Sequence, residues 1–232
     1  MGCEKNNYRK EFIDTFQTLT GKYNRWTIWE DFVAMFACAL SNSADAEHFG
    51  KREDMYQKIV EKYTEKEQEV FPSLVSFVIN AYGENTEQDF LGSIFMELGL
   101  GNERNGQFFT PYCVSRMMSA MMLENIVEEV KDKGFVTISD PCCGAGALLI
   151  AGVNTAKDML SAENMNFRNH VIVAAQDIDM TTALMCYIQL TILGVAGFVK
   201  IGDSLANPIC EGDSHENYWF TPMYMEMMRA AR

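Results

Sequence analysis

Several features that define common functional classes are missing from this chain of 232 residues. It has no run of 18 apolar residues, and its N-terminus lacks the apolar core of a signal peptide, so we expect no contact with a membrane. The seven cysteines are odd in number and follow no regular spacing, which indicates the reducing cytoplasm. Only three histidines are present, and Cys142-Cys143 is an adjacent pair rather than C-x-x-C. We therefore expect no metal site.

Basic residues are scarce and are not clustered. The chain carries 19 Lys and Arg against 32 Asp and Glu, a net charge of −13. Residues 1–100 hold 17 acidic and 10 basic side chains, and the remainder holds 15 and 9. Affinity for nucleic acid rests largely on Lys and Arg that neutralise phosphates. This chain alone should therefore bind DNA or RNA weakly.

Residues 1–100 predict a helical domain without a chemical motif. The apolar segment from Asp31 to Leu40 predicts a buried helix, and Glu53 to Val70 predicts a charged helix with one apolar stripe. A further apolar helix is expected from Leu74 to Tyr82. Thr86-x-x-Asp89 resembles a capping box that would open a helix from Glu87 to Leu98. Aromatic residues at helical spacing are expected in the core: Phe12, Phe16, Trp26, Trp29 and Phe32.

The second half alternates strands and helices. The β-branched run from Phe135 to Ser139 predicts a buried strand, and a glycine turn and a helix from Ala147 follow it. Two more strands, at 171–175 and 197–201, are also followed by acidic residues. Ligands of parallel α/β sheets bind at the carboxyl ends of strands. The acids Asp140, Asp177 and Asp203 therefore predict a ligand with an amine, a sugar diol and a base edge. No clear strand is expected after Asn207.

Phe109-Thr110-Pro111 precedes another predicted helix, Tyr112 to Leu123. Pro111 suits the first helical position, with Thr110 as the N-cap. Such an N-terminus suits a carboxylate ligand, although a plain helix cap explains it equally well. The apolar side of this helix is rich in methionine and is expected to pack in the core: Val114, Met117, Met118 and Met121.

The glycine turn lacks the signatures of phosphate-bearing ligands. A dinucleotide site of the G-x-G-x-x-G type would have a third glycine where this chain has Leu149. The acid that binds the ribose in such sites lies about 20 residues after the glycines, whereas Asp177 lies farther along the chain. No Gly-Lys-Ser/Thr follows, which excludes a Walker P-loop. The pattern favours S-adenosylmethionine, which has no phosphate and whose amino group Asp140 could bind. An ordinary tight turn is the plain alternative.

Four motifs carry a resemblance to a known family: Gly106-Gln107-Phe108-Phe109-Thr110-Pro111, Asp140-Pro141-Cys142-Cys143-Gly144-Ala145-Gly146, Gln176-Asp177 and Gly202-Asp203-Ser204-Leu205. In this order they resemble the modification subunit of type I restriction-modification systems, which is an adenine-specific DNA methyltransferase. The resemblance covers roughly residues 86–206 and implies a Rossmann-like fold. We therefore expect a helical domain at residues 1–100 and an S-adenosylmethionine-binding domain with a partial parallel sheet at 101–232.

The resemblance also implies a role for each motif. Thr110 and the neighbouring backbone would hold the methionyl carboxylate, and the glycine turn would hold the amino acid portion. Asp177 would bind the ribose hydroxyls, and Asp203 the amino group of the cofactor's adenine. The target adenine would be flipped out of DNA that a specificity subunit recognises. The residues assigned to the cofactor are Phe109, Thr110, Pro111, Asp140, Pro141, Gly144, Gly146, Asp177 and Asp203.

The element that accepts the target amine in this family, Asn/Asp-Pro-Pro-Tyr/Phe, is missing from the sequence. Asn207-Pro208 supplies its first half, and Tyr224 supplies an aromatic ring at about the right distance. These three residues are the candidates for catalysis. The alternatives are a homologue that binds S-adenosylmethionine without transferring the methyl group, and a methyltransferase for a substrate other than DNA. A homo-oligomer is also compatible with the sequence.

Overall fold

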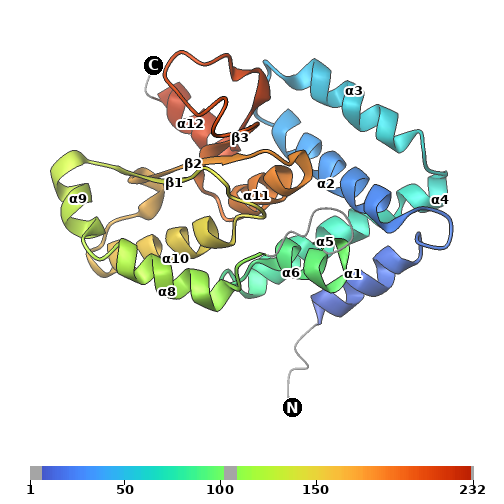
Figure 1. Ribbon diagram of the computed structural model, residues 1–232, viewed down its shortest axis with the longest axis horizontal. Helices are drawn as coiled ribbons and strands as arrows, with labels where there is room; N and C mark the ends of the chain where they lie inside the picture. Colours follow the sequence, from blue (N-terminus) through green and yellow to red (C-terminus); the bar gives the residue numbers. More distant parts are fainter. Residues whose placement is uncertain (1–6, 102–108, 231–232) are drawn as a thin grey trace.

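The computed structural model describes residues 7–101 and 109–230 (Figure 1). Within the described residues the N-terminal part contains the helices α1 Tyr8–Gln17, α2 Arg25–Asn42, α3 Phe49–Val60, α4 Glu65–Gln68, α5 Val70–Glu84 and α6 Phe90–Glu97. The predicted aromatic core is confirmed. Phe12, Phe16 and Trp29 are fully buried, and the ring of Phe12 meets those of Trp29 and Phe32 edge-on. Burial of these rings is a main source of the stability of this part.

Two helix boundaries differ from the predictions. The charged helix expected from Glu53 to Val70 is broken at 61–64, because Thr64 begins α4 with a capping box that Glu67 completes. The capping box expected at Thr86 is also wrong. Asp89 itself is the N-cap of α6, and its carboxylate accepts a hydrogen bond from the Gly92 N–H at 2.9 Å. In both places a polar side chain other than the predicted one caps the start of the helix.

The C-terminal part is a four-stranded sheet in the order β1-β2-β3-β4. The strands β1 Val136–Asp140, β2 Val171–Asp177 and β3 Ala196–Ile201 are parallel, as predicted, and β4 Tyr218–Phe220 is antiparallel to β3. The helices of this part are α8 Tyr112–Met122, α9 Ile126–Lys133, α10 Ala147–Ala162, α11 Met180–Ile192 and α12 Pro222–Ala230, and the short 3-10 helices are η1 Phe167–Asn169 and η2 His215–Asn217. The strand β4 was not predicted, because a three-residue strand is too short to show alternation.

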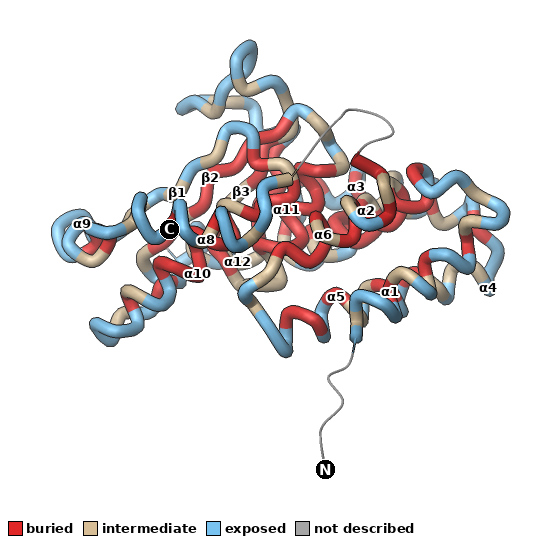
Figure 2. Tube along the Cα trace, turned by 60° about the horizontal axis from the view of Figure 1, so that its bottom comes forward, coloured by how far each residue is buried: buried red, intermediate tan, exposed pale blue. Residues whose placement is uncertain are grey.

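The strand β1 is less buried than predicted. Its residues alternate between partly buried and exposed, whereas β2 is buried almost throughout (Figure 2). The cause is position: β1 is at the edge of the sheet and β2 lies between two strands. The sequence pattern identifies a strand but not whether a neighbour covers its second side.

The methionine side of α8 is also not where it was predicted. Met117 and Met121 are 61% and 70% exposed, and Val114 and Met118 are exposed as well. The helix packs against α10 through its small polar residues instead, with Ser115 and Ser119 buried. The prediction that these methionines belong to the core is therefore wrong.

A single hydrophobic core runs from the helices into the sheet, from Phe12 in α1 to Trp219 in β4. Gln189 of α11 is a buried polar link between the two parts. Its amide accepts hydrogen bonds from the Tyr82 hydroxyl and the Leu91 N–H, and donates to Asp89 and to the Ala145 carbonyl. The division of the chain at residue 100 stays a prediction. None of the helices within the described ranges has the length and hydropathy needed to cross a bilayer.

Candidate functional site

A hollow of ≈ 290 Å³ opens where β1 ends. The glycine turn forms one wall, and the segment before α8 forms the other. It is lined by Phe109, Thr110, Asp140, Cys142, Cys143, Gly144, Ala145, Ala147 and Leu148. The structure thus brings together the two motifs that lie some thirty residues apart in the sequence. Gly106, Gln107 and Phe108 of the first motif are outside the described residues.

Both glycines of the turn are required by its geometry. Gly144 has φ +52°, and a Cβ there would lie 3.1 Å from the ring of Phe109. Gly146 has φ +94°, and a Cβ there would lie 2.7 Å from the Cys186 sulfur. These backbone angles favour glycine, because a Cβ clashes in the left-handed region. The turn therefore keeps bare backbone at the hollow and starts α10 directly behind it.

Asp140 is the charged group of the hollow. Its Oδ1 accepts a hydrogen bond from the Cys142 N–H at 3.0 Å. Burial and, to a smaller degree, the charge of Asp177 raise the pKa of Asp140, while the Cys142 N–H opposes that shift. Within the part of the chain that the structure describes, no Lys or Arg forms an ion pair with Asp140. The hollow therefore presents a carboxylate that has no cationic partner.

Asp177 is placed behind the turn rather than in the hollow. Its buried carboxylate accepts hydrogen bonds from the Gly144 N–H at 2.7 Å, the Asp179 N–H at 2.9 Å and the Thr182 hydroxyl at 3.2 Å. These bonds tie the glycine turn to the end of β2. The structure therefore gives Asp177 a role in shaping the turn, which its sequence position alone did not indicate. Binding of a ribose by the same carboxylate stays a prediction.

Asp203 follows β3 and closes a local turn. Its Oδ1 accepts hydrogen bonds from the Leu205 N–H at 2.8 Å and the Ala206 N–H at 3.3 Å. The neighbouring Ser204 hydroxyl lies 3.7 Å from the Cys142 sulfur. The turns after β1 and β3 therefore meet, and the three predicted acids all lie at the carboxyl ends of their strands. Asp203 itself does not line the hollow.

The start of α8 differs from the prediction. The N-cap is Pro111 rather than Thr110, and its carbonyl accepts hydrogen bonds from the N–H groups of Val114 and Ser115. Thr110 makes no capping hydrogen bond and is exposed beside the hollow. Its hydroxyl is therefore not used to cap the helix.

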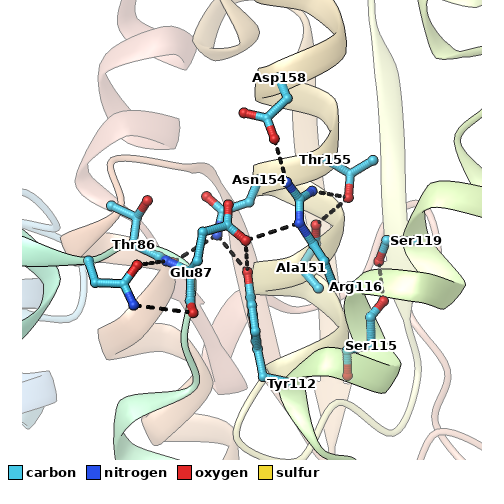
Figure 3. A network of polar contacts seen from close by, with 11 residues as sticks. Thr86, Glu87, Tyr112, Ser115, Arg116, Ser119, Ala151, Asn154, Thr155 and Asp158 are labelled. Atoms are coloured by element: carbon cyan, nitrogen blue, oxygen red, sulfur yellow. Dashed lines mark hydrogen bonds and ion pairs between the residues drawn. The ribbon is translucent and has the colours of Figure 1, made fainter.

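A polar network that sequence analysis missed holds the first turns of α8 (Figure 3). The guanidinium of Arg116 donates hydrogen bonds to Thr155 and Asp158 of α10, and its Nε lies 3.0 Å from a Glu87 carboxylate oxygen. Tyr112 donates to the same Glu87 at 2.9 Å and accepts from Asn154 at 2.9 Å. The network joins α8 to α10 and to the segment before α6. It thereby fixes Phe109 and Thr110 relative to the glycine turn. No motif marks these residues, since each bond depends on the tertiary packing.

The catalytic candidates are not gathered at the hollow. The Asn207 side-chain oxygen and the Pro208 carbonyl accept hydrogen bonds from the buried Lys200 ammonium at 3.1 and 2.9 Å. Tyr224 stacks on Phe220, with 5.6 Å between ring centroids, and lines a separate aromatic hollow of ≈ 300 Å³. Their part in catalysis stays a prediction. No group of three or more potential metal ligands occurs in the two described ranges.

The fold and the site define an α/β protein with a ligand-sized hollow at the carboxyl ends of its parallel strands. The family model for N-6 DNA methylases matches residues 93–225, more than half of the chain. The chain therefore belongs to this family of adenine DNA methyltransferases, which confirms the family resemblance. The match begins within α6 and includes α8, the glycine turn and all four strands. A search of curated proteins finds no match.

Proposed function

We propose that the hollow at the end of β1 binds S-adenosylmethionine and that the protein acts in the methylation of adenine in DNA. The observation that carries this proposal is the Asp140 carboxylate, which lines the hollow beside the glycine turn and has no cationic partner among the described residues. An ammonium group is the natural complement of such a carboxylate. S-adenosylmethionine has an ammonium group, and it would supply the methyl group of the reaction when bound.

The residues at the hollow fit the amino acid end of this cofactor. Asp140 would accept hydrogen bonds from the ammonium group, and the exposed hydroxyl of Thr110 would donate to the carboxylate. Gly144 leaves space for close approach, Gly146 lets the turn pack against Cys186, and Phe109 would cover one side. Pro141 would set the entry to the turn. Asp177 would hold the turn in shape from behind, and its binding to the ribose hydroxyls, like that of Asp203 to the adenine amine, remains part of the proposal.

DNA would be bound with the help of a partner. The chain has a net charge of −13, so repulsion from phosphates opposes its binding to DNA without a basic subunit. A specificity subunit of the kind found in type I restriction-modification systems would supply both the basic surface and the sequence recognition. We place this assembly in the cytoplasm, since the cysteines of the described residues are free thiols.

A second function is favoured by one observation. The Asn207 amide oxygen, the best candidate acceptor for the target amine, is already bonded to Lys200. The same protein could therefore bind S-adenosylmethionine as a regulatory homologue, without transferring the methyl group. The aromatic hollow beside Tyr224 could bind a substrate other than DNA, in which case the protein would be a methyltransferase for that substrate.

Isothermal titration of the full chain with S-adenosylmethionine tests the premise that both functions share. We expect saturable binding, and we expect Asp140→Asn to weaken it about 10- to 100-fold, as removal of a charged hydrogen-bond acceptor does. Asp54→Asn, at an exposed site on α3, is the matched control and should bind as the wild type does. The absence of binding at millimolar ligand would overturn the proposal. Transfer of labelled methyl groups to adenine-rich duplex DNA, with and without co-expressed neighbouring gene products, then separates the enzyme from the regulatory binder.

A further inference from the structure

A second hollow lies near the starts of the parallel strands, whereas the hollow at the glycine turn lies at their carboxyl ends. Part of its wall comes from η1, which precedes β2, and from the end of α11, which precedes β3. Its volume of ≈ 440 Å³ is typical of sites for small molecules. We call it the basic hollow after the two charged residues that line it, Lys157 of α10 and Arg168 of η1. No described residue lines both hollows, so this one is separate from the site above.

The charge of the basic hollow is opposite to that of the chain. The protein has 32 Asp and Glu against 19 Lys and Arg, yet no carboxylate among the described residues lines this hollow. By contrast, the hollow at the end of β1 contains Asp140, and the aromatic hollow contains Asp45, Glu47 and Glu211. Two cations without an acid between them create a positive potential, which attracts anions.

Neither cation of the basic hollow is neutralised within the protein. The side chains of Lys157 and Arg168 are exposed, and in the described ranges they form no ion pair and donate no hydrogen bond. The Arg168 guanidinium lies 5.7 Å from the ring centre of Phe167, and one of its nitrogens would be 2.7 Å from a Cβ added to Gly194. Gly194 thus leaves room for it. A guanidinium whose donors are free binds a phosphate or a carboxylate through two parallel hydrogen bonds.

Much of the remaining wall is apolar. Ile79 of α5, Phe167 of η1 and Ile192 of α11 line the basic hollow together with the two cations. A bare ion such as inorganic phosphate would leave these side chains uncovered. An ion joined to an apolar or aromatic body would bury them and would gain hydrophobic free energy. The hollow therefore suits a ligand that combines both parts.

Two polar residues of the same wall are connected to the hollow at the end of β1. Tyr82 donates to Gln189 at 2.6 Å, and Gln189 donates to the Ala145 carbonyl of the glycine turn at 2.8 Å. Asn154 donates to the Tyr112 hydroxyl at 2.9 Å, within the network at the start of α8 (Figure 3). The Asn154 amide oxygen accepts no hydrogen bond from the described residues, so a ligand can donate to it. A ligand on Tyr82 and Asn154 would thus touch the supports of both walls of the other hollow.

We propose that the basic hollow binds a small molecule that joins a phosphate or carboxylate group to an apolar body, and that its occupant strengthens the binding of S-adenosylmethionine. The anionic group would accept hydrogen bonds from Lys157 and Arg168, and the body would cover the apolar wall. A ligand that orders Tyr82 and Asn154 also orders the walls of the hollow at the end of β1, which couples the two affinities. Only this coupling rests on the proposed function of that hollow.

The test is isothermal titration of the full chain at 150 mM salt with three probes. Uridine 5′-monophosphate carries a phosphate on an aromatic body, octanoate carries a carboxylate on an apolar chain, and inorganic phosphate has no body. We expect one of the first two to bind one-to-one and at least about tenfold more tightly than inorganic phosphate, and the probe that binds identifies the anionic group. Lys157→Gln combined with Arg168→Gln should weaken that binding at least about tenfold.

A second variant tests the shape of the hollow without changing its charge. Gly83 lines the hollow, and nothing lies within 4 Å of a Cβ built there, so Gly83→Trp adds a large side chain at the site and should also weaken binding. Gly21→Trp, at another open glycine, is its control. Lys58→Gln combined with Lys66→Gln removes the same charge from α3 and α4 and should leave binding unchanged.

The site is overturned if neither uridine 5′-monophosphate nor octanoate binds, if inorganic phosphate binds equally well, or if the control variants lose as much affinity as the hollow variants. The coupling is tested by titrating S-adenosylmethionine with and without a saturating amount of the bound probe. We expect the affinity to rise at least about fivefold. An unchanged or lower affinity would overturn the coupling. The titrations of the anions contain no S-adenosylmethionine, so the basic hollow and the proposed cofactor site can fail separately.

Discussion

At the scale of single residues, Asp140 links the structure to a measurable dependence on pH. Burial, assisted by Asp177, raises the pKa of this carboxyl above its ordinary value near 3.9. A cationic ligand requires the ionised form, so the affinity for S-adenosylmethionine should fall as the pH drops through the raised pKa. Ionisation of the buried carboxyl costs stability in the absence of ligand. This cost declines as the pH falls through the raised pKa and is gone below the ordinary value of the unfolded chain.

The measurement is a series of titrations of wild type and Asp140→Asn between pH 8 and pH 4. We expect the wild-type affinity to decline toward acid and the variant to show weak affinity with little pH dependence. A decline of the same size in both proteins would show that another group is responsible.

Gly146 gives a prediction for stability. Its φ of +94° and the 2.7 Å approach of a Cβ to the Cys186 sulfur make alanine unfavourable. Gly146→Ala should lower the free energy of unfolding by at least about 1–2 kcal/mol, the cost of a left-handed backbone for a residue with a Cβ. Gly21→Ala is the control, because nothing lies within 4 Å of a Cβ there and its φ is not positive. Urea denaturation followed by circular dichroism measures both, and equal stability would contradict the clash.

The two motifs predicted a binding site at the glycine turn, and the structure places residues of both around one hollow, while what the hollow binds stays a prediction. The motifs were insufficient to assign each side chain. Asp177 has the position of a ligand-binding acid, but the three donors that bond to it belong to its own chain. Those bonds depend on how β2 and the glycine turn meet, which no spacing in the sequence encodes.

At the scale of elements, Arg52 fastens α3 to the sheet. Its guanidinium donates to Asp45 and to the Tyr218 carbonyl, each at 2.7 Å, and lies 4.0 Å from the ring centre of Trp219. Burial alone would raise the pKa of Asp45, but hydrogen bonds from His48 and Arg52 outweigh it and lower that pKa. The contribution of Asp45 to stability is therefore present at neutral pH and is lost as the pH falls through the lowered value.

Arg52→Ala should lower the free energy of unfolding by about 3–5 kcal/mol, because it leaves the buried Asp45 without its cation. Lys51→Ala is the matched control. Its partner Glu216 is exposed, and exposed pairs contribute about 0–1 kcal/mol. Thermal and urea denaturation of the two variants check the difference. Similar losses in both would mean that the buried pair does not stabilise the contact between α3 and β4.

Some elements could not be predicted for physical reasons. The strand β4 has three residues and is held by its pairing with β3 and by aromatic contacts with Phe198, so no local pattern marks it. The helix α8 was predicted with nearly correct ends, but the side that faces the core was predicted wrongly: the methionines are exposed, and the side of Ser115 and Ser119 is buried. Helical periodicity shows that an apolar side exists, and only the packing decides whether this chain or another covers it.

At the scale of the whole molecule, the order of elements predicted an α/β sheet, and the structure confirms one with three parallel strands. The family match gives the class of reaction, while the charge opposes a solitary DNA enzyme. These two observations agree if the Lys and Arg side chains that contact the DNA phosphates belong to another subunit.

This division of labour predicts a difference in salt dependence. With a labelled duplex of about 30 base pairs at 50 mM salt, the chain alone should show negligible binding at micromolar concentration, because it offers few cations to displace counterions. The complex with its basic partner should bind, and its affinity should fall steeply with salt, since log K declines by about 0.9 per neutralised phosphate. Fluorescence anisotropy across a salt series measures both slopes, with a duplex of scrambled sequence separating specific from general attraction. Tight, strongly salt-dependent binding by the chain alone would show that its surface gathers enough positive charge locally, and the argument for a basic partner would then fail.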